Sequence, residues 1–427
     1  MAPKTRNYLM LQGPHGPFFA QLADMLRKAG AEVWRVGFNR GDEVFWRRQN
    51  YIGYRDKPAL WPASLDAILD LHQITDLVLY GDSRPIHAQA IELARARGLR
   101  IHVFEEGYLR PFWVTYERDG SNGNSRLMSL PLHAMRTALA GARLDQPLGP
   151  ERWGDMREHI FYGALYHFFV MAMNHHYGNF HPHRGISVVQ EFRLNFRRFL
   201  LMPWHRLERS WATRRIRRSG FPYHIVLLQL EHDASFRAHS DFTSMSEFIS
   251  LCLKGFAEGA PPHHHLVFKA HPLEDGRVAL RQLICEGARE FGIADRVHFV
   301  HGGKLAQVLN AARSAVTVNS TSAQQALWRG LPLRPFGRAV YDKPEFVSAQ
   351  NIADFFAAPI GPDSRAYRDY RHFLLETSQV PGGYYAARSR RHLLRQVVDM
   401  MLAEADPYDA LLRGTAAPRQ QLFAIKS

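Results

Sequence analysis

The chain has 427 residues, 46% of them hydrophobic and 12% aromatic, a composition that excludes a largely disordered protein. This length suits two domains, each large enough to bury a core without disulfide bonds. Cys252 and Cys285 show neither a CxxC motif nor a His/Cys ligand spacing, so no zinc site is predicted. The net charge of +14 predicts an anionic partner, which charge alone does not identify as nucleic acid, anionic lipid or sugar nucleotide.

No targeting or membrane-spanning segment is predicted. The N-terminal sequence reaches Gly13 and Pro14 before an apolar stretch of signal-peptide length develops. The longest apolar window, residues 161–173, contains His167 and is shorter than the roughly 20 residues needed to cross a bilayer. We therefore expect a cytoplasmic protein in a reducing compartment.

Residues 1–150 alternate short β-rich runs with helical stretches, which predicts a Rossmann-like domain with a parallel sheet. Glycines at the ends of these segments suit backbone turns. The predicted strands are 8–12, 32–36, 76–80 and 100–104, and the predicted helices are 18–29, 64–72 and 86–97.

Residues 151–220 predict a helical connection rich in aromatic, histidine and arginine side chains. Between residues 197 and 218 there are eight arginines and a single acidic residue, Glu208, interleaved with tryptophan and other apolar side chains. This mixture is typical of a helix on an anionic membrane surface, although a solvated helix joining two domains accounts for it equally well. The candidate membrane contacts are Trp204, Trp211, Arg214 and Arg215.

A second α/β series over residues 221–345 predicts another Rossmann-like domain, and residues 346–427 predict helices that brace the domains. The predicted strands are 223–230, 265–270, 297–300 and 315–318, and the predicted helices are 245–258, 277–291, 304–313, 322–329 and 364–404, the last broken at 381–383. Two facing domains of this kind form a GT-B arrangement, with a substrate cleft between the carboxyl ends of their strands.

The motif FEEGYLRP, residues 104–111, directly follows a predicted buried strand. Adjacent side chains of an extended chain point in opposite directions, so one carboxylate is expected to face the cleft and the other to be held by the fold. We expect Glu106 to react and Glu105 to be structural, with Arg110 as the nearby cation. A purely structural acidic pair that caps a helix or pairs with Arg110 remains open.

The motif FKAHPLED, residues 268–275, also lies where a strand runs into a loop. A lysine and a histidine two residues apart, followed by a proline that fixes the turn, make a compact cationic site for a phosphate or carboxylate. A buried structural histidine is the alternative explanation. The candidate donor-binding residues here are Lys269, His271, Pro272 and Glu274.

The motif VNSTSAQQA, residues 318–326, places hydroxyl groups and backbone N–H groups at the start of a predicted helix. Such a helix start favours a phosphate, although simple N-capping uses the same residue types. The donor-binding candidates are Asn319, Ser320, Thr321, Ser322 and, after the first strand of this domain, Gln229. Weaker substrate-binding candidates, which turn chemistry equally explains, are Gly13, His15, Gly81, Asp82, Ser83 and Arg84.

Several common enzyme classes lack their motifs in this sequence. No GxxxxGK[ST], HExxH or GxSxG occurs, so nothing supports P-loop hydrolysis, zinc proteolysis or α/β-hydrolase chemistry. No convincing DxD pair lies at a strand end. We therefore expect a metal-independent enzyme without a cofactor, because Lys269, His271 and a helix N-terminus can neutralise a leaving phosphate.

Taken together, YGDSRPIH, EEGYLRPFWVTYERDG, KAHPLED and NSTSAQQAL resemble the capsule polysaccharide biosynthesis/export proteins of Gram-negative bacteria. Within this family, the single-module, KpsS/LipB-like β-Kdo transferase type is the most similar. EEGYLRP together with His271-Pro272 is fairly specific, whereas the other matches are residues common at the turns of α/β proteins. The resemblance extends over most of the chain.

The resemblance implies a GT-B fold, CMP-β-Kdo as donor and a phosphatidylglycerol or lyso-phosphatidylglycerol acceptor at the inner face of the cytoplasmic membrane. Transfer of the first Kdo would begin the poly-Kdo linker of capsular polysaccharide. Related modules retain anomeric configuration through the carboxylate of an E-D-G motif, and Glu106 stands at that aspartate position. One additional methylene group shifts the carboxylate by about 1 Å, which leaves the choice between Glu105 and Glu106 open.

The resemblance also implies a peripheral membrane protein that meets other capsule synthesis and export proteins and does not bind nucleic acid. Two other functions compete with this one. A sugar-nucleotide epimerase on the same scaffold would leave the basic aromatic segment unexplained. A noncatalytic anion-binding component of an export complex would lose nothing when Glu106 is changed to glutamine.

Overall fold

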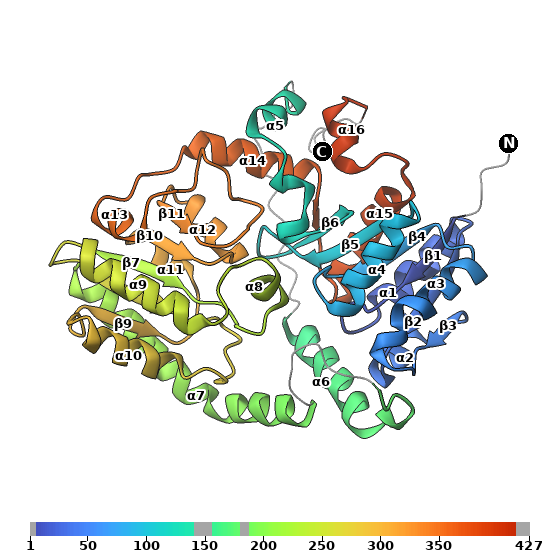
Figure 1. Ribbon diagram of the computed structural model, residues 1–427, viewed down its shortest axis with the longest axis horizontal. Coiled ribbons are helices and arrows are strands. Elements are labelled where there is room, and N and C mark those ends of the chain that lie inside the picture. Colours follow the sequence, from blue (N-terminus) through green and yellow to red (C-terminus); the bar gives the residue numbers. More distant parts are fainter. Residues whose placement is uncertain (1–5, 141–155, 180–187, 416–427) are drawn as a thin grey trace. The chain divides into compact units, whose positions relative to one another are not determined.

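The computed structural model describes residues 6–140, 156–179 and 188–415 (Figure 1). The chain divides into two compact units, of which unit 1 comprises Met1–Val189 and Arg371–Ser427 and unit 2 comprises Gln190–Tyr370. The expected boundaries at residues 150, 220 and 345 do not coincide with this division. The reason is that helix α6 (Met156–Ala172) and the last helices of the chain pack within unit 1.

Unit 1 is built on a sheet that has, within the described residues, seven strands in the order β12-β6-β5-β4-β1-β2-β3. The five strands β1 to β5 are parallel, and four of them (β1, β2, β4 and β5) were predicted, whereas β6 and β12 are antiparallel to their neighbours. The strands are β1 (Asn7–Met10), β2 (Glu32–Gly37), β3 (Tyr51–Gly53), β4 (Asp76–Tyr80), β5 (Arg100–Glu106), β6 (Trp113–Arg118) and β12 (Gln379–Pro381).

Helices cover both faces of this sheet. The helices of unit 1 are α1 (Phe18–Lys28), α2 (Arg40–Trp46), α3 (Trp61–Leu71), α4 (Pro85–Ala96), α5 (Leu132–Ala138), α6, α15 (Ala387–Leu402) and α16 (Pro407–Leu412). Short 3-10 turns are η1 (Pro58–Leu60), η2 (Asn122–Asn124), η3 (Arg126–Met128) and η4 (Asn174–His176).

The alternation of side chains along β5 shows how the two faces are formed. Phe104 packs into a core with residues of α1 and α15, whereas Val103 packs into a second core with residues of α3 and α4. Because side chains of a strand alternate between faces, Glu106 lies on the same side as Phe104, and Glu105 lies on the same side as Val103. The cores therefore fix the opposite orientations of the two glutamates.

Three strands of unit 1 were not predicted, and one of them is the three-residue β3. Strand β6 is buried along its whole length and includes the charged residues Glu117 and Arg118, so it lacks an alternating polar pattern. Strand β12 lies at the expected break in the C-terminal helices and ends at Pro381. Its place at the edge of the sheet is one that proline tolerates.

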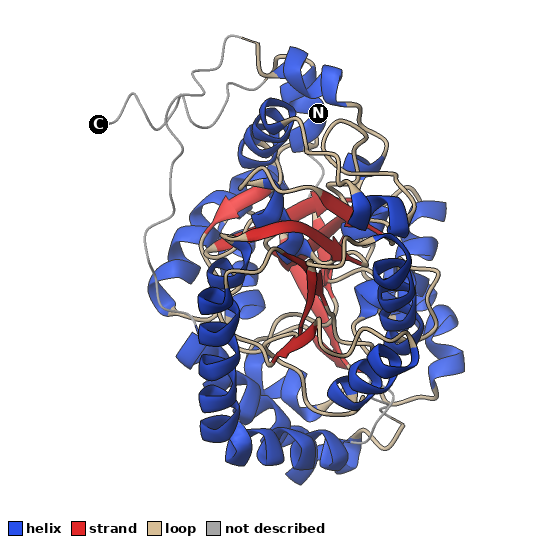
Figure 2. Ribbon diagram, turned by 90° about the vertical axis from the view of Figure 1, so that its left-hand side faces the viewer, coloured by secondary structure: helices blue, strands red, loops and turns tan. Residues whose placement is uncertain are grey.

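Unit 2 contains a parallel sheet in which the described strands follow the order β11-β10-β7-β8-β9. Figure 2 shows helices on either side of the strands. The strands are β7 (Tyr223–Leu227), β8 (His265–Lys269), β9 (Val297–Val300), β10 (Ala312–Thr317) and β11 (Leu333–Pro335). The other elements are α7 (Val188–Ser219), α8 (Ala234–Ala238), α9 (Met245–Gly259), α10 (Leu280–Glu290), α11 (Ala306–Leu309), η5 (Thr321–Ala323), α12 (Gln324–Leu327), α13 (Ile352–Ala357) and α14 (Ser364–Glu376). Helix α7 begins two residues before unit 2, and α14 ends six residues after it.

The α/β prediction for unit 2 is confirmed, but two of its helices are much shorter than expected. The predicted helix 304–313 is only the four-residue α11, because β10 already begins at Ala312. The predicted helix 322–329 is the 3-10 turn η5 followed by the four-residue α12. The two helices therefore contribute a single turn each at this end of the sheet.

Helix α7 runs without interruption through Pro203 and contains the basic aromatic segment of the predicted connection. Trp204, Trp211, Arg214 and Arg215 are all exposed on it. Among the residues that the structure describes, no helix has the length and apolar character needed to cross a membrane.

Candidate active site

Three loops meet at the carboxyl edge of the unit 1 sheet. They follow β1, β4 and β5, and β4 pairs with both of the other strands. Since these strands are parallel, the segments that follow them emerge at one edge of the sheet. The structure thus brings the two glutamates together with residues 81–84, here called the Gly81 loop. These residues were among the weaker candidates for substrate binding.

Glu106 is held by a tyrosine from the neighbouring strand. The hydroxyl of Tyr80, the last residue of β4, donates a hydrogen bond of 3.1 Å to Oε1 of Glu106. Burial and the adjacent Glu106 carboxylate raise the pKa of Tyr80 well above its usual value, so the phenol remains protonated and keeps donating. Tyr80 thereby orients the carboxylate that we expect to react.

Glu105 is more closely tied to the backbone. Its Oε1 accepts the backbone N–H of Glu106 at 2.9 Å, and its carbonyl oxygen accepts the hydroxyl of Tyr384 at 2.8 Å. A β-carbon at Gly81 would lie 3.2 Å from Oε2 of Glu105, and the φ angle of +70° at this position also favours glycine. This environment agrees with the structural role expected for Glu105.

Arg110 does not pair with either carboxylate. It is exposed, and its Nε donates to the carbonyl oxygen of Gly107 at 3.2 Å. No ion pair between Arg110 and an acidic side chain is present in the described part of the chain. The expected cation beside Glu106 is therefore not formed by this residue in the structure.

Asp82 of the Gly81 loop joins this loop to the loop after β6 through hydrogen bonds. Its buried carboxylate accepts the backbone N–H of Ser121 at 2.8 Å, the side-chain N–H of Asn124 at 3.2 Å and the hydroxyl of Ser83 at 2.9 Å. These bonds fix the loop after β6 against the loop after β4. Asp82 and Ser83 therefore shape the edge of the sheet from inside.

Arg84 is the cation that the fold places near the tyrosine of the site. Its guanidinium group lies 5.7 Å from the centre of the Tyr80 ring, and its Nη1 donates to Gln12 at 3.3 Å. Gln12 in turn donates to the buried carboxylate of Asp42 at 3.0 Å. A chain of polar contacts therefore positions Arg84 at the same edge as Glu106.

The loop after β1 is covered by α6. The ring of His15 stacks on Tyr166 with 4.3 Å between ring centres, and a β-carbon at Gly16 would lie 3.0 Å from the ring of Tyr162. Gly13 is buried against Phe19. These contacts explain the glycines of this loop by close packing.

Tyr80 and Tyr384 were missed by sequence analysis. Their rings meet edge to face, with 5.4 Å between the ring centres. Tyr80 was detectable in principle, because it ends a predicted strand directly before Gly81. Tyr384 had no local signal, since it reaches Glu105 from 279 residues further along the chain.

In unit 2, Lys269 ends strand β8 and is almost completely buried. Burial, followed by repulsion from the Arg209 guanidinium, lowers the pKa of Lys269 to about 8. Among the described residues, its Nζ has only a long contact of 3.5 Å, with the carbonyl oxygen of Ala270. A buried ammonium group with so weak a partner is well suited to meet an anion.

His271 and the residues after it form a tight turn. The ring Nδ1 of His271 accepts the backbone N–H of Leu273 at 3.1 Å, so a neutral ring carries its proton on Nε2. Pro272 is exposed, and Glu274 is half-buried with a pKa raised chiefly by burial. Glu274 accepts the backbone N–H of Gly276 at 3.0 Å, which stabilises the turn.

Gln229 and Asn319 hold the loops after β7 and β10 together. Gln229 Nε2 donates to Asn319 Oδ1 at 2.7 Å, and the Asn319 backbone N–H donates to Gln229 Oε1 at 2.9 Å. Asn319 Nδ2 also donates to the carbonyl oxygens of Ser235 and His239. The amide groups of both residues are thus engaged in internal bonds, which gives them a structural role.

The predicted phosphate cradle over residues 320–322 does not rest on a long helix. Ser320 caps the short turn η5, its hydroxyl lies 2.7 Å from that of Ser322, and Thr321 is half-buried beside them. Because α12 has only four residues, the helix dipole expected here is small. N-capping, the simpler of the two explanations, describes this segment.

The segment after Lys269, residues 270–275, is here called the Lys269 loop. Sequence analysis also missed its contacts with the loop after β9, which packs on helix α7. A β-carbon at Gly302 would lie 3.4 Å from Pro272, and one at Gly303 would lie 2.3 Å from Cδ of Arg209. The ring of His301 stacks on His205 of α7, with 3.9 Å between ring centres. The glycines after β9 therefore allow α7 to approach the Lys269 loop.

No group of three or more His, Cys, Asp or Glu side chains in the described ranges has the geometry to hold a metal ion. The edge of unit 1 holds the Glu106 carboxylate bound by Tyr80. The edge of unit 2 holds the buried Lys269 with His271 nearby.

The fold and these two edges define an α/β protein with two Rossmann-like units. The capsule polysaccharide biosynthesis protein family matches this chain over residues 75–385, and the chain belongs to that family. It is 29% identical to the capsule polysaccharide export protein KpsS of Escherichia coli over 381 residues, 89% of this chain and 97% of that protein. It is also 29% identical to the capsule polysaccharide modification protein LipB of Neisseria meningitidis serogroup B, over 90% of this chain and 92% of that protein.

Solved structures with a similar fold include the Thermosulfurimonas dismutans KpsC β-Kdo 2,7 transferase. It has a TM-score of 0.43 at 11% identity, with 93% of this chain and 100% of that chain covered. Staphylococcus aureus MnaA in complex with UDP has a TM-score of 0.32 at 11% identity, with 94% and 99% covered.

Proposed function

We propose that this chain is a retaining β-Kdo transferase that moves Kdo from CMP-β-Kdo to a phosphatidylglycerol or lyso-phosphatidylglycerol acceptor and so begins the poly-Kdo linker of capsular polysaccharide. The observation that carries the proposal is the Glu106 carboxylate, held by Tyr80 at the carboxyl edge of a Rossmann-like sheet. Membership of the capsule polysaccharide biosynthesis family supports the sugar chemistry. The choice of Kdo rests on the resemblance of the EEGYLRP and HP motifs.

In this proposal the reaction has two displacements. An oxygen of Glu106 attacks the anomeric carbon of Kdo while the bond from that carbon to the CMP phosphate oxygen breaks, which releases CMP and leaves a glycosyl ester. The acceptor hydroxyl then attacks the same carbon, loses its proton to a base and frees Glu106. Two inversions give net retention.

Lys269 and His271 are proposed to bind the anionic groups of the donor. An ammonium group and an imidazole N–H near the CMP phosphate compensate the negative charge that grows as the sugar leaves. This arrangement supplies positive charge from the chain itself, so the proposed reaction needs neither a metal ion nor a cofactor.

The acceptor sets the proposed location. A phosphatidylglycerol acceptor requires the protein to work at the inner face of the cytoplasmic membrane as a peripheral protein. Other capsule synthesis and export proteins are the proposed neighbours that extend and transport the product.

The proposal is tested with CMP-Kdo generated in the reaction mixture and a fluorescent lyso-phosphatidylglycerol acceptor. Mass spectrometry of the lipid is expected to show the mass of added Kdo, and NMR of the product is expected to show the β configuration. No adduct, in a mixture where a known Kdo transferase remains active, would refute the assignment.

The site assignment is tested by Glu106→Gln, with Glu105→Gln as the adjacent matched variant. We expect Glu106→Gln to lower kcat by at least about 1,000-fold, because the nucleophile is lost. We expect Glu105→Gln to retain much more activity, since Gln preserves its bond from the Glu106 N–H. Equal losses in both variants, or full activity of Glu106→Gln, would contradict the assignment.

A further inference from the structure

Helix α7 carries an exposed stripe of large apolar side chains within unit 2. The spacings between these residues are four, four, three and four, which places them on one face of a helix that turns about 100° per residue. Each of the five is between 53% and 76% exposed. The apolar stripe consists of Phe196, Leu200, Trp204, Leu207 and Trp211.

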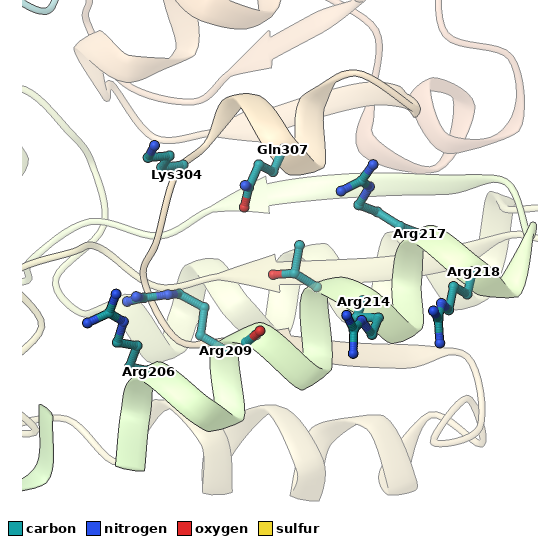
Figure 3. Close-up of a pocket in the computed structure, with 9 residues that line it drawn as sticks. Arg206, Arg209, Arg214, Arg217, Arg218, Lys304 and Gln307 are labelled. Carbon is teal, nitrogen blue, oxygen red and sulfur yellow. The ribbon is translucent and has the colours of Figure 1, made fainter. Parts of the chain in front are cut away.

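A cationic cavity lies beside the apolar stripe. It has a volume of about 620 Å³ and is lined by one face of the C-terminal half of α7 and by the segment that leads into α11 (Figure 3). The cationic cavity is lined by Arg206, Arg209, Ser210, Thr213, Arg214, Arg217, Arg218, Lys304 and Gln307. By helical geometry, most of its α7 residues face at least about a quarter of a turn away from the stripe, whereas Arg214 and Arg218 lie beside the stripe or in line with it.

Within the described residues, no acidic side chain pairs with the positive charges of the cavity. None of its five arginines, nor Lys304, forms an ion pair in the part of the chain that the structure describes. Glu208, the acidic residue of this stretch of α7, pairs instead with Arg281. Figure 3 shows Arg206 and Arg209 directed to the side where Lys304 lies.

An anionic phospholipid surface satisfies both features at once. Its phosphate groups pair with guanidinium groups, and the adjoining acyl layer accepts apolar side chains, with tryptophan favoured at the boundary. Arg197 and Arg215 are exposed on the other side of the stripe, so arginines lie along both of its margins. A nucleic acid would meet the arginines but leave the apolar stripe in water.

We propose that α7 docks unit 2 on an anionic bilayer, with the apolar stripe in the interfacial layer and a phospholipid phosphate in the cationic cavity. The same helix contacts the loop after β9, through His205 on His301 and Arg209 on Gly303. This loop touches Pro272 of the Lys269 loop. Docking therefore holds the donor-binding loop near lipid headgroups, a consequence that rests on the proposed function, whereas docking itself does not.

The test is flotation of the full chain with vesicles of phosphatidylcholine alone or with phosphatidylglycerol added. We expect binding only to the anionic vesicles, and less of it as salt increases. Trp204→Ser/Trp211→Ser is expected to weaken binding at least about tenfold through lost interfacial burial. Arg217→Gln/Arg218→Gln is expected to weaken it about 30-fold, from roughly a factor of five per arginine.

Matched controls use similar side chains elsewhere on the surface. Trp328→Ser changes another half-exposed tryptophan of unit 2, and Arg391→Gln/Arg395→Gln removes two exposed arginines of α15. Both are expected to float like the unchanged protein, and circular dichroism checks that every variant is folded.

Three outcomes would overturn the docking proposal. These are equal binding to neutral and anionic vesicles, stripe and cavity variants that float like their controls, and binding to duplex DNA or RNA without binding to vesicles. Transfer to a monomeric short-chain lysophosphatidylglycerol separates the two proposals. Transfer without flotation removes the docking surface alone, whereas flotation without transfer removes the proposed reaction alone.

Discussion

Tyr80 donates a hydrogen bond to Glu106, and we predict that Tyr80→Phe lowers kcat by about tenfold to a hundredfold. This range is the kinetic equivalent of the roughly 1.5–3 kcal/mol that a hydrogen bond to a charged group contributes. KM for the donor should change little, because the phenol contacts the reacting carboxylate. Steady-state kinetics with CMP-Kdo measure both constants.

Tyr54→Phe is the matched control for this prediction. The Tyr54 hydroxyl bonds to the carbonyl oxygen of Lys57 at 2.7 Å, in a different part of unit 1. This variant should keep full activity. A Tyr80→Phe enzyme with unchanged kcat would show that the hydrogen bond does not position the nucleophile.

Lys269 leads to a prediction about pH. Because its pKa is lowered to about 8, the ammonium group is present at neutral pH and is lost as the pH rises above 8. KM for CMP-Kdo should therefore rise on the alkaline side, with a midpoint near or somewhat above 8 once a bound anion favours the charged form. Initial rates from pH 6.5 to 9.5 measure this effect.

The variants Lys269→Arg and Lys269→Met test whether loss of the Lys269 charge causes the alkaline rise of KM. The arginine keeps its charge over this range, so its KM should show no alkaline rise, whereas Lys269→Met should have a high KM at every pH. The same alkaline rise in all three proteins would assign the effect to another group.

At the level of single residues, sequence alone predicted the strand-end positions of the candidate residues in each unit but not all of their partners. Glu105 and Glu106 end strand β5, Lys269 ends β8, and His271 follows it. Because both strands were recognisable, the position of these residues at a sheet edge was predictable. Tyr384 and Arg209 reach the two sites from distant segments. No local pattern encodes such contacts, because they depend on tertiary packing.

The buried residue Glu117 ties strand β6 to helix α16. Its carboxyl group accepts hydroxyl groups from Tyr108 at 3.0 Å, from Ser125 at 2.8 Å and from Tyr408 of α16. Burial raises the pKa of Glu117 to about 8 in spite of these donors. Protonated Glu117 therefore belongs to the folded state at neutral pH.

We predict that Glu117 makes unit 1 less stable as the pH rises. The raised pKa contributes up to about 5 kcal/mol to the free energy of unfolding. This contribution is fully present below pH 4.5, the ordinary pKa of a glutamate, and is lost by about pH 8. Glu117→Gln cannot ionise, so its unfolding free energy relative to the unchanged protein should improve from pH 5 to 8.5. Urea unfolding at these two pH values measures the difference.

The exposed Glu92 of α4 gives a matched control. The unfolding free energy of Glu92→Gln should differ from that of the unchanged protein by a similar amount at pH 5 and at pH 8.5. If Glu117→Gln behaves in the same way, the Glu117 carboxyl group is not the source of the pH dependence.

Among the elements, the parallel strands of four or more residues were predictable because each is a short apolar run bounded by turns, whereas the three-residue strands β3 and β11 were missed. The antiparallel strands β6 and β12 were missed as well. β6 buries charged residues in bonds to distant segments, such as Arg118 to the carbonyl oxygens of Met400 and Ala403. β12 has only three residues, which is too short for a periodic signal.

Over the whole molecule, unit 1 depends on both ends of the chain. Strand β12 pairs with β6, and α15 contributes Leu393, Val397 and Met401 to the core that also contains α1. We predict that a chain ending at Glu376, the last residue of α14, loses the cooperative unfolding of unit 1. A chain ending at Thr415 keeps every described contact and should unfold like the full protein.

Differential scanning calorimetry distinguishes these two chains. The shorter one should lose a transition, while unit 2 keeps its own sheet and core. Two transitions as in the full chain would mean that the C-terminal strand and helices are dispensable for unit 1.

The strand β12 that closes the unit 1 sheet also imposes an order on folding during synthesis. Unit 2 is one continuous stretch, Gln190–Tyr370, so all of its residues are available before the last part of unit 1 is made. The first 189 residues must wait, with one edge of their sheet unpaired and one core incomplete, until the final segment is translated. Unit 2 is thus an insertion that can fold while its host is still unfinished.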